Sequence, residues 1–197
     1  PTGLSPIKYL NGADWDGLGN LYYLDSTSTN ALYPGDPVKL VAGLDAAGGL
    51  PTIDLATAGS TAVGVAIAIG ANRFGPYVDP TNLTLLNAPE TKAKDYFVLV
   101  IDDPNVIFEI QENSSSGGNA ALTYTSATKN ANFVYAAPAA GAAYSGVQLD
   151  VTTVAATSTL NLKLLGPSPR PDNALGYYAK WQALLNNHSY RTGVAGI

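Results

Sequence analysis

The chain has 197 residues, 46% of them hydrophobic, enough to bury a core in one domain or in a domain with an extended arm. Charged residues make up only 13%, about half of the usual share, and small polar residues and Tyr are abundant, so we expect strands, turns and a surface covered by neighbouring proteins. A net charge of −5 without a run of Lys or Arg argues against nucleic acid as a partner, and the absence of Cys excludes thiol nucleophiles and thiolate metal ligands.

The beginning of the chain lacks the charged start and apolar stretch of a secretion signal. No apolar run approaches the roughly 20 residues that span a bilayer. We therefore expect a protein made in the cytoplasm, with no membrane partner.

Residues 1–33 are expected to form an extended N-terminal arm, because glycines interrupt the segment repeatedly and leave it little regular periodicity. Such an arm would lie on a neighbouring protein. Its strongest apolar patch, and a candidate interface, is Leu21, Tyr22, Tyr23 and Leu24.

Residues 34–165 are expected to form the β core domain. The sequence Tyr-Pro-Gly-Asp-Pro at residues 33–37 predicts a turn, and a short strand follows over residues 38–41. Residues 62–69 alternate large β-branched side chains with Gly or Ala, which predicts a strand that packs tightly on one face.

Two β-branched and aromatic runs, residues 96–101 and 106–111, are joined by Asp-Asp-Pro-Asn, which predicts a β-hairpin. Val106, Phe108 and Ile110 share one face of the second run, so that face is expected to be buried. The sequence alone explains the paired Asp residues as turn residues rather than as a catalytic acid and base.

Two later strands are predicted over residues 147–154 and 159–165, after a serine- and glycine-rich surface loop at residues 113–119. Six to nine short strands in all indicate a mainly β protein. We expect one core, in a single β-sandwich or β-barrel that is jelly-roll-like or β-tulip-like.

Residues 166–197 are expected to follow the core as a connector, a final element and a tail. Three prolines make residues 166–171 a stiff connector. Residues 175–187 fit either a strand or a short helix, and the strand is favoured. The tyrosines serve either interfaces or the core. The candidate interface residues in this part are Tyr177, Tyr178, Val194 and Ile197.

The residues that could carry chemistry are few. His188 is the single histidine, and it fits hydrogen bonding within the fold better than catalysis. Asp14-Trp15-Asp16-Gly17 contains only a fragment of a calcium-binding loop, and turns explain it better. We expect no catalytic residue, no metal site and no cofactor.

Three segments of the chain resemble head structural proteins of tailed bacteriophages. The longest is residues 96–111, with its Asp-Asp-Pro turn before Val-Ile-Phe-Glu-Ile-Gln. The second is Tyr-Pro-Gly-Asp-Pro-Val at residues 33–38, with Val-Gly-Val-Ala at residues 63–66, and the third is Asn-Asn-His-Ser-Tyr-Arg at residues 186–191. In these segments the chain is similar to the capsid decoration, or cement, proteins of such phages.

The resemblance implies a β-sandwich or barrel, without catalytic residues, that binds the outer surface of an assembled capsid and clamps adjacent major capsid proteins. We expect the protein to act as a dimer or trimer, with the major capsid protein and itself as partners. Deletion of residues 1–25 is then expected to weaken attachment and leave the core folded.

Two other functions fit the same composition. One is a carbohydrate-binding β-sandwich module, in which Trp15 and Trp181 would stack on sugars. The other is a different virion component, such as a fibre or tail domain.

Overall fold

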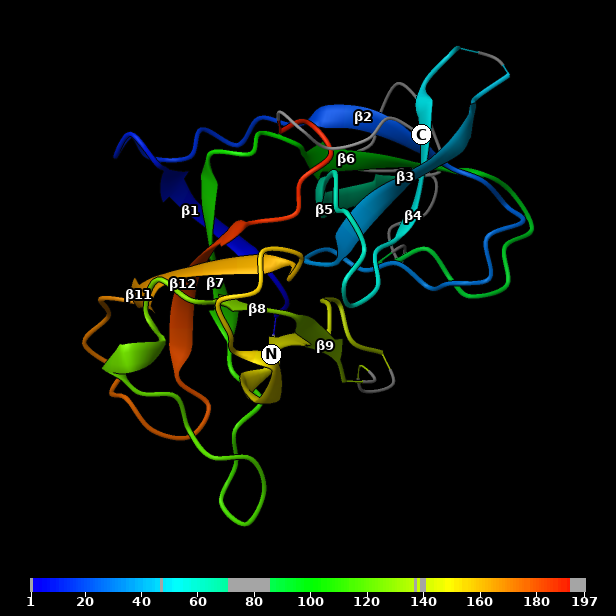
Figure 1. Ribbon diagram of the computed structural model, residues 1–197. Coiled ribbons are helices and arrows are strands. Elements are labelled where there is room, and N and C mark those ends of the chain that lie inside the picture. Colours follow the sequence, from blue (N-terminus) through cyan, green and yellow to red (C-terminus); the bar gives the residue numbers. More distant parts are fainter. Residues whose placement is uncertain (1, 47, 71–85, 137, 139–140, 192–197) are drawn as a thin grey trace.

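Figure 1 shows a computed structural model of the chain, which describes residues 2–46, 48–70, 86–136, 138 and 141–191. Strands dominate these residues, so the predicted mainly β class is confirmed. The elements are β1 (Ser5–Tyr9), β2 (Asn20–Leu24), β3 (Pro37–Leu44), β4 (Pro51–Leu55), β5 (Gly64–Gly70), β6 (Tyr96–Ile101), β7 (Val106–Gln111), the 3-10 helix η1 (Tyr124–Ser126), β8 (Asn130–Ala131), β9 (Phe133–Tyr135), β10 (Val147–Leu149), the 3-10 helix η2 (Val151–Thr153), β11 (Leu162–Pro167) and β12 (Lys180–Leu185).

The strands form two bodies that lie side by side (Figure 1). Strands β2, β4, β3, β5 and β6 close a barrel in that order. Strands β1, β7, β12, β11 and β8 form a five-stranded sheet, and β9 and β10 pair beside it. Closure removes free strand edges from the barrel, whereas the sheet has an edge at β1.

In the described residues, the buried apolar side chains form two clusters instead of the one core expected. One fills the barrel, with Tyr22, Ile53 and Val98 among its members. The other lies against the sheet and includes Phe108 and Trp181. This second cluster also takes in side chains from the barrel strands, so the two bodies are packed against each other rather than merely tethered.

The predicted N-terminal arm is not present, because residues 2–33 supply a strand to each body. β1 pairs with β7 in the sheet. β2 pairs with β6 in the barrel through five successive residues. The glycines that interrupt this part of the sequence therefore lie in and beside the connection between two strands. Deletion of residues 1–25 would remove β1 from the sheet and β2 from a closed barrel, so we no longer expect the core to stay folded after that deletion.

The predicted hairpin over residues 96–111 is also wrong, although both of its strands are present. β6 pairs with β2 and β5 in the barrel, and β7 pairs with β1 and β12 in the sheet. The four residues between them carry the chain from one body to the other. Val106, Phe108 and Ile110 are buried as predicted. The local pattern defined the strands, but the choice of partner depends on segments far away in the sequence.

The strand favoured for residues 175–187 is confirmed as β12, which pairs with β11 on one side and β7 on the other. β11 itself runs to Pro167, which pairs with Trp181, and Ser168 behind it is buried. The proline-rich connector therefore begins inside a strand, and residue 165 is not a boundary between a core and a separate segment.

Residues 186–191 join the sheet to the barrel. The Ala62 N–H donates to the Asn187 carbonyl (2.9 Å), and the Ser189 N–H donates to the Ala62 carbonyl (2.8 Å). Further along, the Arg191 guanidinium donates to the carbonyl of Pro104 (2.9 Å), within the link between β6 and β7. The β6–β7 link and residues 186–191, two of the connections between the bodies, thus hold each other in place.

A second junction forms where Gly35, before β3, meets the start of the chain. The Leu4 N–H donates to the Gly35 carbonyl (2.9 Å), and the Gly35 N–H donates to the Ala66 carbonyl (2.7 Å). Gly35 has φ +95, and a Cβ atom there would lie 2.4 Å from the Thr2 carbonyl oxygen. Only glycine fits this junction without moving the backbone.

Substitution of Gly35 tests the junction. Gly12 has nearly the same φ, +92, but a Cβ atom there would meet nothing within 4 Å. We expect Gly12→Ala to lower the free energy of unfolding by about 1 kcal/mol through backbone strain, and Gly35→Ala by about 2–4 kcal/mol because a clash is added. Urea denaturation measures both, and equal losses for the two variants would contradict the described junction.

Candidate protein-binding surface

Two adjacent tyrosines, Tyr177 and Tyr178, project from the loop between β11 and β12. Their exposed fractions are 53% and 51%. Tyr178 has φ +62, a conformation that Thr128 alone shares among the described non-glycine residues. A bulky side chain in this left-handed region costs about 1–3 kcal/mol, so other contacts must hold it there.

Two side chains, one at the end of β7 and one just after it, hold both peptide groups of Tyr178. Its N–H donates to Ser114 Oγ (3.1 Å), and its carbonyl accepts from Gln111 Nε2 (3.1 Å). The backbone of an exposed aromatic residue is thereby fixed before any partner arrives. This lowers the entropy that the loop would lose on binding.

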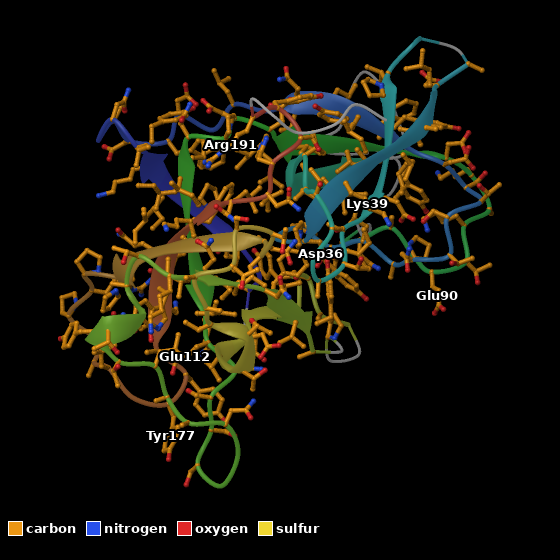
Figure 2. All side chains as sticks on the ribbon, viewed as in Figure 1. Asp36, Lys39, Glu90, Glu112, Tyr177 and Arg191 are labelled. Atoms are coloured by element: carbon orange, nitrogen blue, oxygen red, sulfur yellow. The ribbon has the colours of Figure 1, made fainter. Side chains whose placement is uncertain are left out.

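Ser114 is itself held by Glu112, a carboxylate with no exposed surface. Glu112 Oε1 accepts from the Ser114 hydroxyl (2.5 Å) and from the Leu122 N–H (3.3 Å), and Oε2 accepts from the Trp181 indole N–H (2.7 Å). A buried carboxylate is tolerated only when donors satisfy it, and here three segments supply them. Figure 2 shows Glu112 and Tyr177 in the same lower part of the molecule.

Gln111 connects the tyrosine loop to the exposed side of the sheet. The pairing of β7 with β12 puts Glu109, Gln111 and Lys180 on that side, whereas Phe108 and Trp181 point into the core. The face is therefore polar in its middle and carries aromatic residues at one end. We call the surface formed by Glu109, Gln111, Arg170, Tyr177, Tyr178 and Lys180 the outer face.

Glu109 is the centre of charge on the outer face. It accepts from the Ser168 hydroxyl, from Lys180 Nζ (3.1 Å) and from Arg170 Nη1 (3.2 Å). Partial burial raises the pKa of this carboxyl group, but the Ser168 hydroxyl and the two cations outweigh burial and lower it below its usual value. Shallow grooves of about 410 Å³ and about 140 Å³ flank Glu109.

The outer face has the composition of a protein-binding surface. Tyr and Arg are enriched where interfaces gain most of their binding energy, and the charges here are already paired within the chain. A partner could therefore cover the face without burying a lone charge. Of the candidate interface residues, Tyr177 and Tyr178 belong to this face.

The other candidate interface residues do not belong to the outer face. Tyr22 and Leu24 are buried in the barrel, which contradicts their prediction as an exposed patch, and Leu21 and Tyr23 are only partly exposed. The Tyr22 hydroxyl donates to Asp102 Oδ2 (2.7 Å), and burial, with this bond, raises its pKa. Tyr22 and Leu24 are buried because β2 pairs with its neighbours inside the barrel. Val194 and Ile197 lie outside the described residues.

The two tryptophans do not form an exposed pair of rings on which a sugar could stack. Trp181 is fully buried, with its indole N–H bound to Glu112, so it cannot stack on a ligand. Trp15 is partly exposed and packs against the sheet core. The expectation of two stacking tryptophans is therefore wrong for Trp181.

The acidic segments serve the local structure. Asp16 Oδ1 accepts from the Tyr9 hydroxyl (2.9 Å) and the Leu18 N–H (3.2 Å), as expected of a turn. Asp102 accepts from Asn20 and Tyr22. Within the part of the chain that the structure describes, no group of three His, Asp or Glu side chains lies close enough together to hold a metal ion.

His188 is buried where residues 186–191 meet the barrel. Its Nδ1 accepts from the Tyr190 N–H (3.1 Å), and its Nε2 has no hydrogen-bond partner among the residues that the structure describes. Burial, with a contribution from nearby Arg191, lowers its pKa to about 4. The imidazole is therefore neutral near pH 7 and enclosed by the fold, which agrees with the structural role predicted for it.

Comparison of the chain with protein-family models, with curated proteins and with solved structures finds no match in any of the three. In the described residues there is also no helix with the length and apolar character needed to cross a bilayer.

The buried network was missed by the sequence interpretation. Residues 113–119 looked like a surface loop, yet Ser114 is fully buried. The sequence contained only a weak indication that Glu112 is buried. Glu112 directly follows a strand of buried residues, but a polar residue in that position usually marks the end of a strand. No local sequence pattern indicated that Ser114 and Trp181 would donate hydrogen bonds to Glu112.

Glu112→Gln tests the network. The amide nitrogen would face at least one N–H or O–H donor, which leaves buried donors unsatisfied. We expect the free energy of unfolding to fall by about 2–4 kcal/mol, measured by urea denaturation. Glu90→Gln makes the same chemical change at an exposed site and serves as the control. A loss below about 0.5 kcal/mol for Glu112→Gln would rule out the anchoring role.

Two buried groups, His188 and Asp36, make the free energy of unfolding depend on pH in opposite directions. The pKa of His188 is about 4 in the folded chain against 6.5 in the reference state, so the folded state binds fewer protons between these values. Stability from His188 therefore falls by about 2 kcal/mol as the pH drops from about 6.5 to about 4.5. Burial raises the pKa of Asp36 from 3.8 to about 6, against hydrogen bonds from Ser145 and the Tyr33 N–H, so its contribution rises by about 2 kcal/mol over the same range.

The two contributions offset each other, and we expect nearly constant stability of the native chain between about pH 6.5 and about pH 4.5. In His188→Asn, which keeps an acceptor for the Tyr190 N–H, stability should rise on acidification. In Asp36→Asn it should fall. Urea denaturation across this range measures both slopes, and unchanged slopes in both variants would show that neither group titrates as described.

Proposed function

We propose that this chain is a non-catalytic structural protein of a bacteriophage virion. It binds the outer surface of the assembled capsid and cements adjacent major capsid proteins. The proposal joins two lines of support: the resemblance of three sequence segments to phage head proteins, and an exposed surface suited to contact with another protein.

The observation that carries the proposal is the strained display of Tyr178 beside Tyr177. Strained backbone conformations cluster at functional sites, where the surrounding structure holds them, and here a buried carboxylate network holds Tyr178. Tyrosine provides a large contact area and has few rotatable bonds to order. The outer face therefore contacts the capsid, with the tyrosine loop at one end of the face as the main anchor.

The two-body architecture suits a cement. A protein that binds the assembled lattice and not the free subunits shifts the equilibrium toward the assembled state. Several weak contacts made by one rigid unit give higher avidity than any one of them. The barrel and the sheet, packed together through the second apolar cluster, form such a unit.

Attachment to heads tests this function. Purified heads that lack this protein are mixed with the native chain or with the Tyr177→Ala/Tyr178→Ala variant, and bound protein is measured after sedimentation. Loss of the two anchoring tyrosines should weaken binding by about 100-fold, which corresponds to about 3 kcal/mol. Tyr124→Ala removes a tyrosine with a 73% exposed fraction elsewhere on the chain and should bind like the native protein.

Native-like occupancy by the double variant would show that the tyrosine loop does not make the contact. Failure of the native chain itself to bind heads would remove the proposed function. In that case, binding to fibres or tails of the same phage would favour the alternative of another virion component.

A further inference from the structure

The peptide bond between Asp36 and Pro37 joins two residues whose chemistry favours cleavage of the backbone. The nitrogen of Pro37 belongs to a tertiary amide without an N–H, and it accepts a proton more readily than an ordinary peptide nitrogen. The carboxyl group of Asp36 can close a five-membered ring onto the carbonyl carbon of the same residue. Two further Asp-Pro pairs occur in the sequence, at residues 103–104 and at residues 79–80, and the second of these lies outside the described residues.

The Asp36 side chain is enclosed where the barrel meets the sheet (Figure 2). Its exposed fraction is 3%. Burial raises its pKa to about 6, although the Ser145 hydroxyl and the Tyr33 N–H both donate to the carboxyl group, the latter to Oδ2 at 2.7 Å. At mildly acidic pH most molecules therefore carry Asp36 as the neutral acid, with a proton available beside the peptide bond.

No cation among the described residues opposes this protonation, because no charged side chain contributes to the raised pKa of Asp36. The titratable group that senses Asp36 is Tyr135, on β9. Burial, and then the charges of Asp36 and Asp54, raise the pKa of Tyr135 well above its usual value. Its hydroxyl donates to the Ala56 carbonyl (2.6 Å), so Tyr135 stays neutral beside Asp36.

The backbone around Asp36 holds the carbonyl group of the same peptide bond. The Ala66 N–H donates to the Asp36 carbonyl (2.9 Å), and the Ala66 carbonyl accepts from the Gly35 N–H (2.7 Å). Attack on a carbonyl carbon places negative charge on its oxygen, and an N–H that already points at this oxygen stabilises the charge. On the other side of the bond, the Pro37 carbonyl accepts from the Ala56 N–H (2.9 Å), so both halves of the bond are fixed in the barrel.

We propose that the chain cleaves its own backbone between Asp36 and Pro37 in mildly acidic solution. A carboxyl oxygen of neutral Asp36 attacks the carbonyl carbon of the same residue, and the carboxyl proton passes to the nitrogen of Pro37. The C–N bond breaks, which leaves a cyclic anhydride at Asp36 and a secondary amine at Pro37. Water then opens the anhydride to the side-chain carboxyl group and a new C-terminal carboxyl group. The net reaction is hydrolysis of one peptide bond, once per molecule.

The two pieces remain together after the cut. The first piece contains β1 and β2, which pair with β7 and β6 in the second. Buried side chains of β2, such as Tyr22 and Leu24, also hold it in the barrel. The inference is independent of the proposed binding to capsids, because the reaction takes place in the isolated chain.

Incubation of the native chain at about pH 5, followed by denaturation and intact-mass measurement, tests the reaction. We expect pieces 1–36 and 37–197 to accumulate, and at about pH 7.5 about 30-fold more slowly, because few molecules then carry the neutral acid. Cleavage between Asp103 and Pro104 should be at least about tenfold slower, since Asp103 is exposed and its Oδ1 is held by Asn105. In concentrated urea at the same pH, the preference for Asp36 should disappear.

Three variants serve as controls. Asp36→Asn cannot supply the proton, and Pro37→Ala restores an ordinary peptide nitrogen, so both should keep the bond intact. Asp103→Asn should cleave like the native chain.

Three results with the native chain would each overturn the proposal: no piece 1–36 from folded protein at about pH 5, equal cleavage at residues 103–104, or the same preference for Asp36 in urea. Binding to heads is a separate measurement. Its failure would remove the proposed function and leave this result standing, and the reverse also holds.

Discussion

The buried carboxylate of Glu112 is the constraint on which the candidate surface depends. Because it has no exposed surface, its oxygens must find donors inside the protein, and the three donors come from separate segments. The end of β7, the loop that follows it and β12 are therefore fixed relative to one another. Ser114 passes this constraint to Tyr178, whose strained backbone it helps to hold together with Gln111.

The segments that connect the barrel and the sheet also make them one unit. Four residues link β6 to β7, and residues 186–191 return from the sheet to the barrel beside that link. Arg191 bonds one connection to the other. A unit of this kind loses little conformational entropy when it binds, so under the proposed function a larger share of its contact energy would go into holding neighbouring subunits together.

The sequence predicted the strands with strong local patterns and failed where partners are distant. Residues 62–69 and 106–111 alternate clearly and became β5 and β7. The hairpin prediction failed because a four-residue turn between strands normally returns the chain beside itself, whereas here β6 and β7 enter different sheets. β1 and β2 were missed because their stability comes from pairing with β7 and β6, more than 70 residues along the chain.

The candidate surface was predictable only in part. Adjacent tyrosines at positions 177 and 178 indicated an interface, and they are exposed. The same pattern at positions 22 and 23 was misleading, because a barrel buries one of two successive side chains and Tyr22 is the buried one. No local pattern distinguishes these two pairs. The difference is set by tertiary pairing, as is the meeting of Glu112 with Ser114 and Trp181.

The position and orientation of this chain in purified phage particles, imaged at residue resolution, test the central claim most directly. The account predicts density for the chain on the outside of the head, with Tyr177 and Tyr178 against major capsid protein subunits. Density elsewhere in the particle, or on the head with the tyrosine loop turned toward solvent, would contradict it.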